Sequence, residues 1–173
     1  MASPATEIDA GGRAVRVTNP DRVIYPATES TAEVTKLMVV EYYLAVAPGI
    51  MRALDHRPTT LERWPKGVHE GITLSTRSGE HGDAFYQKRV PKGAPSYVET
   101  ASITFPSGRP ADEVCPTEVA VVAWAAQMGT LTFHPWPVRR DDVDHPDEMR
   151  IDLDPQPGTG FPEAARVAGV ARG

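Results

Sequence analysis

Apolar residues recur every three or four positions from Val34 to Ala45. This spacing places their side chains on one face and predicts a helix. Ser30 and Glu33 have the spacing of a capping box, so the helix is predicted to begin near Thr31.

Two further helices are predicted towards the end of the chain. The first covers residues 117–128, with Thr117 as its N-cap and Gly129 placed to end it. Its body of alanines and valines is apolar nearly all round, which indicates a buried helix. The second begins at residues 160–163, where a proline occupies the first turn. The proline-glycine pair at 48–49 should bend or interrupt the earlier helix.

Several short segments combine β-branched and aromatic residues in the manner of strands. They are residues 15–17, 59–64, 84–89, 101–105 and 130–134. Residues 1–14 are small, polar and without periodicity, and we expect a disordered leader there.

The chain has 173 residues, of which 40% are hydrophobic, enough for one globular domain with its own core over residues 15–173. No apolar run approaches the length of a membrane span, and the first residues lack the pattern of a secretory signal, so we expect a cytoplasmic protein. Cys115 is the single cysteine, which excludes an intrachain disulfide and a multi-cysteine zinc site, and its apolar neighbours predict a buried thiol.

The net charge of −5 argues against a nucleic-acid partner, because phosphate binding is normally carried by surplus lysine and arginine. The charges are nevertheless segregated. Residues 57–92 hold seven Lys or Arg against four Asp or Glu, whereas residues 141–154 hold seven acidic residues against Arg150 alone. A polyanion-binding surface beside an acidic metal patch fits this division, but an unrelated protein with a segregated surface would have the same pattern.

Asp152 and Asp154 are candidate metal ligands. On a strand, their side chains would share one face about 7 Å apart, while Ile151 and Leu153 would point into a core. A hard divalent ion such as Mg²⁺ or Mn²⁺ would neutralise the pair, in the geometry of metal-dependent nucleotidyl transfer. Taken alone, the motif favours the alternative of a solvated strand end before the turn at 155–158.

Two further features carry candidate chemistry. Phe85 and Tyr86 are adjacent on a predicted strand, so one should join the core and the other is free to stack on a base. On pattern alone, the favoured interpretation is one core residue and one surface residue that bind no ligand. His134, at a strand end, is a candidate phosphate donor or proton shuttle, although a lone histidine is more often structural.

The order of short motifs resembles the polymerase domain of bacterial ligase D, in the archaeo-eukaryotic primase superfamily. The matching blocks are residues 18–26 (TNPDRVIYP), 41–43 (EYY), 57–58 (RP), 63–68 (RWPKGV), 84–88 (AFYQK), 131–134 (LTFH) and 152–155 (DLDP). The resemblance covers nearly everything from Val15 onward. With the alternation of strands and helices, it implies a mixed α+β fold with an antiparallel-rich sheet and packed helices.

The resemblance implies a DNA-repair primase-polymerase that adds nucleotides, often ribonucleotides, at DNA gaps and broken ends, including in non-homologous end joining. Asp152 and Asp154 would bind two divalent ions, Mn²⁺ or Mg²⁺, and His134 would lie near the phosphates of the nucleoside triphosphate. The DNA contacts would come from Arg22 and Lys36 on a downstream 5′-phosphate, from Phe85 and Tyr86 on the template, and from Arg63 and Lys88. Glu62 departs from the family, where a lysine is common, which would weaken template binding. A protein of this class would associate with the nucleoid.

Family members continue after the Asp-x-Asp motif through a segment that carries a third metal aspartate. We therefore expect residues 15–173 to be the N-terminal part of such a domain, with exposed apolar surface and weak or absent polymerase activity in isolation. One hypothesis is a nucleotidyltransferase completed by a separate chain that supplies the missing half. Another is a non-catalytic module that binds DNA ends or 5′-phosphates beside a DNA ligase or end-joining factor. An unrelated metal-binding protein remains only if the ordered motifs are coincidental.

Overall fold

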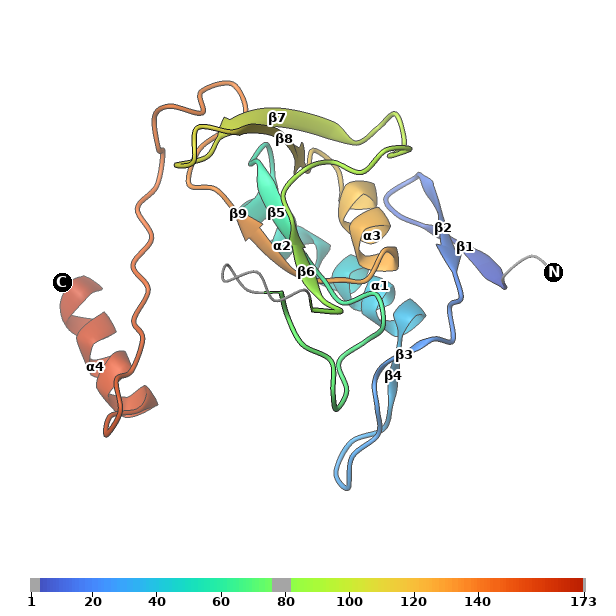
Figure 1. The fold of residues 1–173 in the computed structure, drawn as a ribbon, viewed down its shortest axis with the longest axis horizontal. Helices are drawn as coiled ribbons and strands as arrows, with labels where there is room; N and C mark the ends of the chain where they lie inside the picture. The colour runs from blue at the N-terminus through green and yellow to red at the C-terminus, as the bar shows by residue number, and fades with distance from the viewer. Residues whose placement is uncertain (1–3, 76–81, 173) are drawn as a thin grey trace.

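The computed structural model describes residues 4–75 and 82–172. Its elements follow one another as β1 (Ala5–Asp9), β2 (Ala14–Thr18), β3 (Val23–Tyr25), β4 (Val34–Thr35), α1 (Lys36–Ala45), α2 (Ala47–Leu54), β5 (Thr59–Arg63), β6 (Phe85–Gln87), β7 (Glu99–Thr104), β8 (Pro110–Cys115), α3 (Val119–Gln127), β9 (Thr130–Pro135) and α4 (Phe161–Arg172). Figure 1 shows strands and helices gathered in one body, from which the C-terminal segment extends to α4.

Strand β5 is the centre of the main sheet. It pairs along its length with β9, and its opposite edge pairs with β6 and, at Thr59, with β8, which in turn pairs with β7. All of these pairings are antiparallel, and two further antiparallel hairpins, β1-β2 and β3-β4, lie outside this sheet. The predicted α+β fold with an antiparallel-rich sheet is confirmed.

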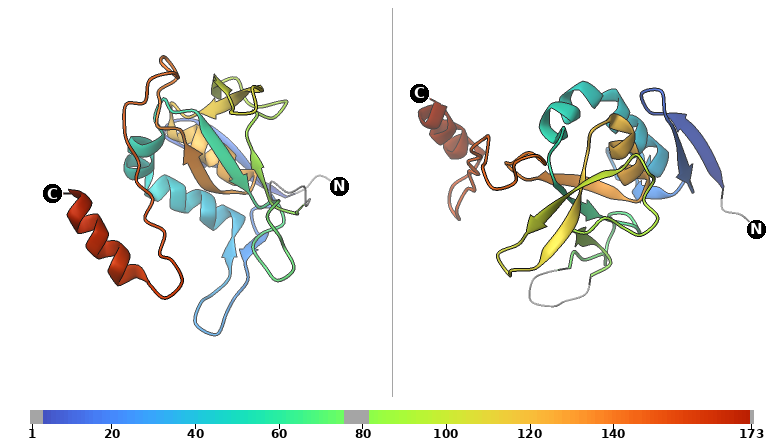
Figure 2. Two further views of the ribbon diagram at one scale, coloured as in Figure 1. Left: turned by 60° about the vertical axis from the view of Figure 1, so that its left-hand side comes forward. Right: turned by 90° about the horizontal axis from the view of Figure 1, so that it is seen from above.

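The hydrophobic core lies between the sheet and helices α1 and α3. Leu61 of β5 is fully buried in it. Phe133 of β9, which pairs with Leu61, packs against the same cluster. In α3, every residue from Ala120 to Ala126 is buried, as the apolar composition predicts. Helices α1, α2 and α3 lie together on one side of the sheet in the right-hand view of Figure 2. Because side chains alternate along a strand, the neighbours of Leu61 point to the opposite face.

The predicted disordered leader is wrong for residues 4–14. Ala5–Asp9 pairs with Ala14–Thr18, and the amide of Gly12 donates to the Asp9 carboxylate at 3.0 Å in the turn between them. Alternate side chains of β1 are half-buried, and Val15 and Val17 of β2 are buried in the core. Residues 1–3 of the predicted leader lie outside the described residues.

Helix α1 begins at Lys36 rather than near Thr31. Val34 and Thr35 are held extended by pairing with β3, and Thr35 forms the N-cap by accepting a 3.4 Å hydrogen bond from the amide of Met38. The predicted interruption is confirmed, because α1 and α2 meet at Val46 with a bend of 80°.

Among the described residues, no single helix is long and apolar enough to cross a membrane. Helices α1 and α2 pass a test of length and composition only when they are taken together across their 80° bend.

Residues 150–154 do not form the predicted strand. They pair with no strand among the described residues, Ile151 is 58% exposed, and only Leu153 of the two expected core residues is half-buried. Among the described residues, no strand pairs with this alternating motif and no apolar surface buries Ile151. The helix predicted after residue 160 is confirmed as α4, which has no buried residue and stands apart from the body in Figure 1.

Candidate nucleic-acid and metal sites

Arg22 and Lys36 line one pocket of about 280 Å³ at the start of α1. The Arg22 guanidinium donates to the carbonyl of Pro65 at 2.8 Å, and the Lys36 ammonium donates to the carbonyl of Thr18. The backbone of Gly129 completes the wall of the pocket. The structure therefore brings together two cations that the sequence places in separate elements.

A tight turn positions both cations. Asn19 has a positive φ of 49°, and its carbonyl accepts a 3.1 Å hydrogen bond from the amide of Arg22. The amide of Lys36 then donates to the carbonyl of Arg22 at 2.8 Å, and the amide of Leu37 donates to the carbonyl of Pro20 at 3.0 Å. The first turn of α1 is thus fixed directly against the turn that carries Arg22.

The pocket is electropositive and partly desolvated. Lys36 is only 7% exposed, and its pKa is lowered first by burial and then by the charge of Arg22. A bound anion would offset both effects, because an opposite charge favours the protonated ammonium. Lysine and arginine are also the side chains that bind phosphate through charge-assisted hydrogen bonds.

A second cluster lies on the face of the sheet opposite the helices. Glu62 of β5 and His134 of β9 form a contact of 2.9 Å between Oε2 and Nε2. The other oxygen of Glu62 accepts a 2.9 Å hydrogen bond from the indole of Trp64. Tyr86 of β6 presents its ring to His134 in an edge contact, with ring centroids 5.4 Å apart. The pairing of β5 with both β6 and β9 thus places a carboxylate, an imidazole and a phenol side by side.

Glu113 of β8 extends this polar face into the interior. Its side chain is fully buried and accepts hydrogen bonds from the Thr60 hydroxyl at 2.9 Å and the Trp136 indole at 3.0 Å. Burial raises the pKa of Glu113, while these two hydrogen bonds act in the opposite direction. The prediction from sequence did not include β8, and its charged, proline-containing sequence gave no strand signal.

Arg63 of β5 and Phe85 of β6 are paired in the same sheet. The Arg63 guanidinium donates to the carbonyl of Met128 at 2.8 Å and 3.1 Å and to the side chain of Gln87 at 2.5 Å, and it lies 5.3 Å from the centre of the Phe85 ring. Burial lowers the pKa of Arg63. Several of its donors therefore already have protein partners.

Tyr86 of β6 and Lys88, which follows this strand, are both exposed. Tyr86 is 44% exposed whereas Phe85 is half-buried, as the alternation of a strand predicts. The exposed Lys88 lies over the ring of Phe105, with 4.5 Å between its ammonium nitrogen and the ring centre.

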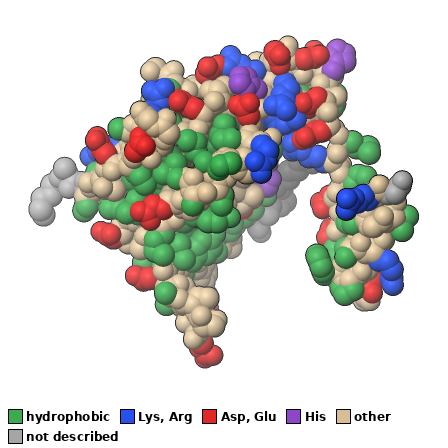
Figure 3. All heavy atoms as spheres, turned by 180° about the vertical axis from the view of Figure 1, so that it is seen from behind, with side chains coloured by type: hydrophobic (Ala, Val, Ile, Leu, Met, Phe, Trp, Pro, Cys, Tyr) green, Lys and Arg blue, Asp and Glu red, His purple; other side chains and the backbone are tan. Residues whose placement is uncertain are grey.

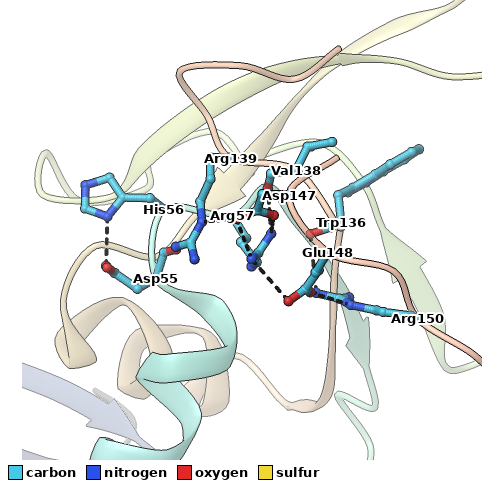
Figure 4. Close-up of polar contacts among 9 residues, drawn as sticks. All are labelled: Asp55, His56, Arg57, Trp136, Val138, Arg139, Asp147, Glu148 and Arg150. Carbon is cyan, nitrogen blue, oxygen red and sulfur yellow. Dashed lines mark hydrogen bonds and ion pairs between the residues drawn. The ribbon is translucent and has the colours of Figure 1, made fainter. Parts of the chain in front are cut away.

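An ion-pair network fastens the segment after β9 to the loop before β5 (Figure 4). Arg57 is 3% exposed and makes two hydrogen bonds to Asp147, at 2.6 Å and 3.0 Å, and a 3.2 Å ion pair to Glu148. Arg139 donates to the same Asp147 carboxylate at 2.8 Å and to the carbonyl of Asp55 at 2.6 Å. The two guanidinium groups hold the pKa of Asp147 well below its usual range.

Arg150 continues this network towards the Asp-x-Asp motif. Its side chain pairs with Glu148 and donates to the carbonyls of Pro135 and Trp136 at the end of β9. The side chain of Arg150, two residues before Asp152, therefore contacts the end of the strand that carries His134.

Asp152 and Asp154 follow this anchor on an extended segment. Both are exposed, and they line a groove of about 400 Å³ together with Glu163 of α4. No group of three acidic, histidine or cysteine side chains that could hold a metal ion is found in residues 4–75 and 82–172. One or two carboxylates with water molecules nevertheless suit Mg²⁺, so the donor set fits one hydrated divalent ion. Figure 1 places this segment and the turn before α1 on different sides of the molecule.

An apolar surface lies beside the cationic pocket. Tyr25, Met38 and Tyr42 are exposed and line a hollow of about 480 Å³ next to α1. The face shown in Figure 3 carries a broad apolar area, with most of its charged side chains around the rim.

Comparisons with known proteins agree with one another. A family model described as the LigD primase-polymerase domain matches residues 35–173. The multifunctional non-homologous end joining protein LigD of Mycolicibacterium smegmatis is 36% identical over 160 residues, which cover 91% of this chain and 19% of that protein. The multifunctional non-homologous end joining DNA repair protein LigD of Mycobacterium tuberculosis strain H37Rv is 28% identical over 179 residues, covering 94% of this chain and 20% of that protein.

A solved structure is similar as well. It is the polymerase domain from Mycobacterium tuberculosis ligase D in complex with DNA, with a TM-score of 0.65 and 29% sequence identity. The match covers 91% of this chain and 51% of that one. The chain thus spans about half of the solved domain and about a fifth of the curated relatives.

Proposed function

Because the chain belongs to the LigD primase-polymerase family, we propose that it acts in DNA repair at gaps and double-strand breaks, where it binds a downstream 5′-phosphate and takes part in nucleotidyl transfer to a DNA 3′ end. The observation that carries the proposal is the pocket shared by Arg22 and Lys36.

The chemistry of this pocket suits a terminal phosphate. Two cations converge on one small cavity, although the chain as a whole has a net charge of −5. A 5′-phosphate carries more negative charge than a phosphodiester, so it gains more from two adjacent cations. Selectivity for a phosphorylated end therefore follows from local charge rather than from a basic surface.

Binding to gapped DNA with and without a downstream 5′-phosphate tests this assignment. Reversing the charge of Arg22 or Lys36 should weaken binding to the phosphorylated DNA by about tenfold and to the unphosphorylated DNA by much less. Arg16→Glu, which changes an exposed cation on β2, is the matched control. Equal losses on the two DNAs would contradict the phosphate pocket.

In nucleotidyl transfer, Asp152 and Asp154 would hold Mg²⁺ or Mn²⁺, which supplies Lewis-acid stabilisation of the reacting phosphoryl group when bound. His134 would donate a hydrogen bond to the polyphosphate of the nucleoside triphosphate. The exposed Tyr86 would stack on the template. Phe85, Arg63 and Lys88 would line the path of the template beside it.

Primer extension tests the catalytic part of the proposal. The chain would be given a gapped, 5′-phosphorylated DNA, Mn²⁺ and either ribo- or deoxynucleoside triphosphates. Extension that Asp154→Ala abolishes would support transfer at the Asp-x-Asp motif, and metal binding unchanged in Asp152→Ala would contradict it.

A second candidate is a non-catalytic module that binds DNA ends. Among the described residues, those that line the pocket of Arg22 and Lys36 lie at positions 18–36, 65 and 127–129, so the pocket does not depend on the carboxylates after β9. In this case a DNA ligase, an end-joining factor or a separate chain that completes a split polymerase would be the partner. Phosphate-selective DNA binding without extension, and extension restored by such a partner chain, would distinguish these roles.

A further inference from the structure

The carboxylate of Glu62 is held by hydrogen bonds at both oxygens, although nothing in the proposed reaction uses it. Its side chain is 14% exposed, and both carboxylate oxygens have partners, the indole of Trp64 at 2.9 Å and the ring of His134 at 2.9 Å. Trp64 is itself fixed, because its amide donates to the carbonyl of Gly129 at 2.7 Å. The carboxylate therefore has little freedom to leave the imidazole.

The register of the sheet determines which atoms meet. Glu62 pairs with Tyr86 on one side and with Thr132 on the other, which makes His134 its diagonal neighbour on the same face. The edge contact with Tyr86 limits rotation of the imidazole from the other side. Its Nε2 is directed at Glu62, while Nδ1 has no hydrogen-bond partner in the part of the chain that the structure describes.

We propose that Glu62 is a positioning residue for His134, which orients the imidazole so that Nδ1 can donate to the polyphosphate of a nucleoside triphosphate. The inference rests on the proposed function, because it deepens the role given to His134. A carboxylate that accepts from one ring nitrogen of histidine fixes the orientation of the ring, and in a ring that carries both protons the second N–H then points towards a bound anion.

The sign of one measurement separates positioning from simple electrostatics. A carboxylate beside a polyphosphate repels it, so a Glu62 that acted only through its charge would weaken binding, and its removal would strengthen binding. A Glu62 that orients His134 has the opposite effect, and its removal weakens binding.

The test uses the 173-residue chain with ¹⁵N-labelled histidine and inorganic triphosphate with Mg²⁺ as the probe. The Nε2–H signal of His134 should be protected from exchange with water in the unsubstituted chain and lost in Glu62→Ala. The dissociation constant for triphosphate, read from the His134 ring signals, should rise about tenfold in Glu62→Ala and severalfold in Glu62→Gln. Glu41→Gln, an exposed carboxylate on α1, is the control and should change it by less than about twofold.

Three results would overturn the inference. One is an unprotected Nε2–H in the unsubstituted chain, and another is tighter or unchanged triphosphate binding in both Glu62 variants with the fold retained by circular dichroism. The third is a lack of response of His134 to triphosphate, which would also remove His134 from the proposed function. Loss of DNA 5′-phosphate selectivity is a separate failure, because the pocket of Arg22 and Lys36 is not lined by this cluster.

Discussion

The ammonium of Lys36 shares a pocket with the guanidinium of Arg22, and each is anchored to a backbone carbonyl, of Thr18 and Pro65 respectively. Burial and the neighbouring guanidinium both lower the pKa of this lysine. Burial and a like charge therefore both disfavour the protonated form of Lys36, as expected of a site that binds an anion such as phosphate.

The preference for 5′-phosphorylated DNA should depend on pH through Lys36. Because its pKa lies below the usual 10.5, the ammonium loses its proton at a lower pH than an exposed lysine does. The phosphate preference should therefore fall as the pH rises towards 10.5, whereas Lys36→Arg should retain it because arginine stays charged. Fluorescence anisotropy with both DNAs across this range measures the difference. The same decline in the arginine variant would assign the effect to another group.

The ion pairs of Asp147 should contribute to acid stability. Its pKa is lowered by hydrogen bonds from Arg57 and Arg139, so the folded chain keeps the carboxylate ionised at a pH where the unfolded chain binds a proton. The contribution is therefore complete above the ordinary pKa of 3.8 and is lost as the pH falls through the lower, folded value. Urea unfolding should show that the stability difference between the unsubstituted chain and Asp147→Asn shrinks on acidification below 3.8. A difference independent of pH would contradict this.

Two glycines with similar backbones should respond differently to alanine. Gly67 and Gly93 have positive φ values of 87° and 81°, but a Cβ on Gly67 would lie 2.8 Å from the carbonyl oxygen of Ile24, whereas Gly93 faces open space. Gly93→Ala should lower the free energy of unfolding by about 1 kcal/mol through backbone strain alone. Gly67→Ala should cost about 2 kcal/mol more because the backbone of β3 must move. Chemical denaturation of both variants compares them, and equal losses would show that the contact with Ile24 relaxes freely.

Local sequence patterns predicted those elements whose secondary structure depends least on contacts with distant segments. Helix α3 is apolar on every side, and β5 and β9 are rich in β-branched and aromatic residues, so each could be identified from its own sequence. The start of α1 was misplaced because Val34 and Thr35 are held extended by β3, a contact with a distant segment. Strand β8 was missed because its buried Glu113 is satisfied by Thr60 and Trp136 from two other segments.

The candidate sites show the same division. The resemblance to a family could pair Arg22 with Lys36, but only the packing of the turn at Asn19 against α1 explains why their side chains meet. The contact between Glu62 and His134 depends on the order and register of β5 and β9, which periodicity does not determine. The sequence pattern of Asp152 and Asp154 predicted a strand that would have required a partner for its exposed edge.

Cys115 should be chemically silent while the chain is folded. The thiol is fully buried, and burial, together with the nearby charges of Asp55 and Asp141, raises its pKa to about 12. Because the thiolate is the reactive form, alkylation in the native state requires opening of the structure around the end of β8. Labelling with iodoacetamide at neutral pH should therefore be slow and should accelerate sharply across the urea unfolding transition. It should be faster in Gly67→Ala than in Gly93→Ala, because the Gly67 substitution is expected to lower the free energy of unfolding more. Rapid labelling without denaturant, at the rate of a free cysteine in a peptide, would show that the thiol is accessible and that the structure around the end of β8 opens readily.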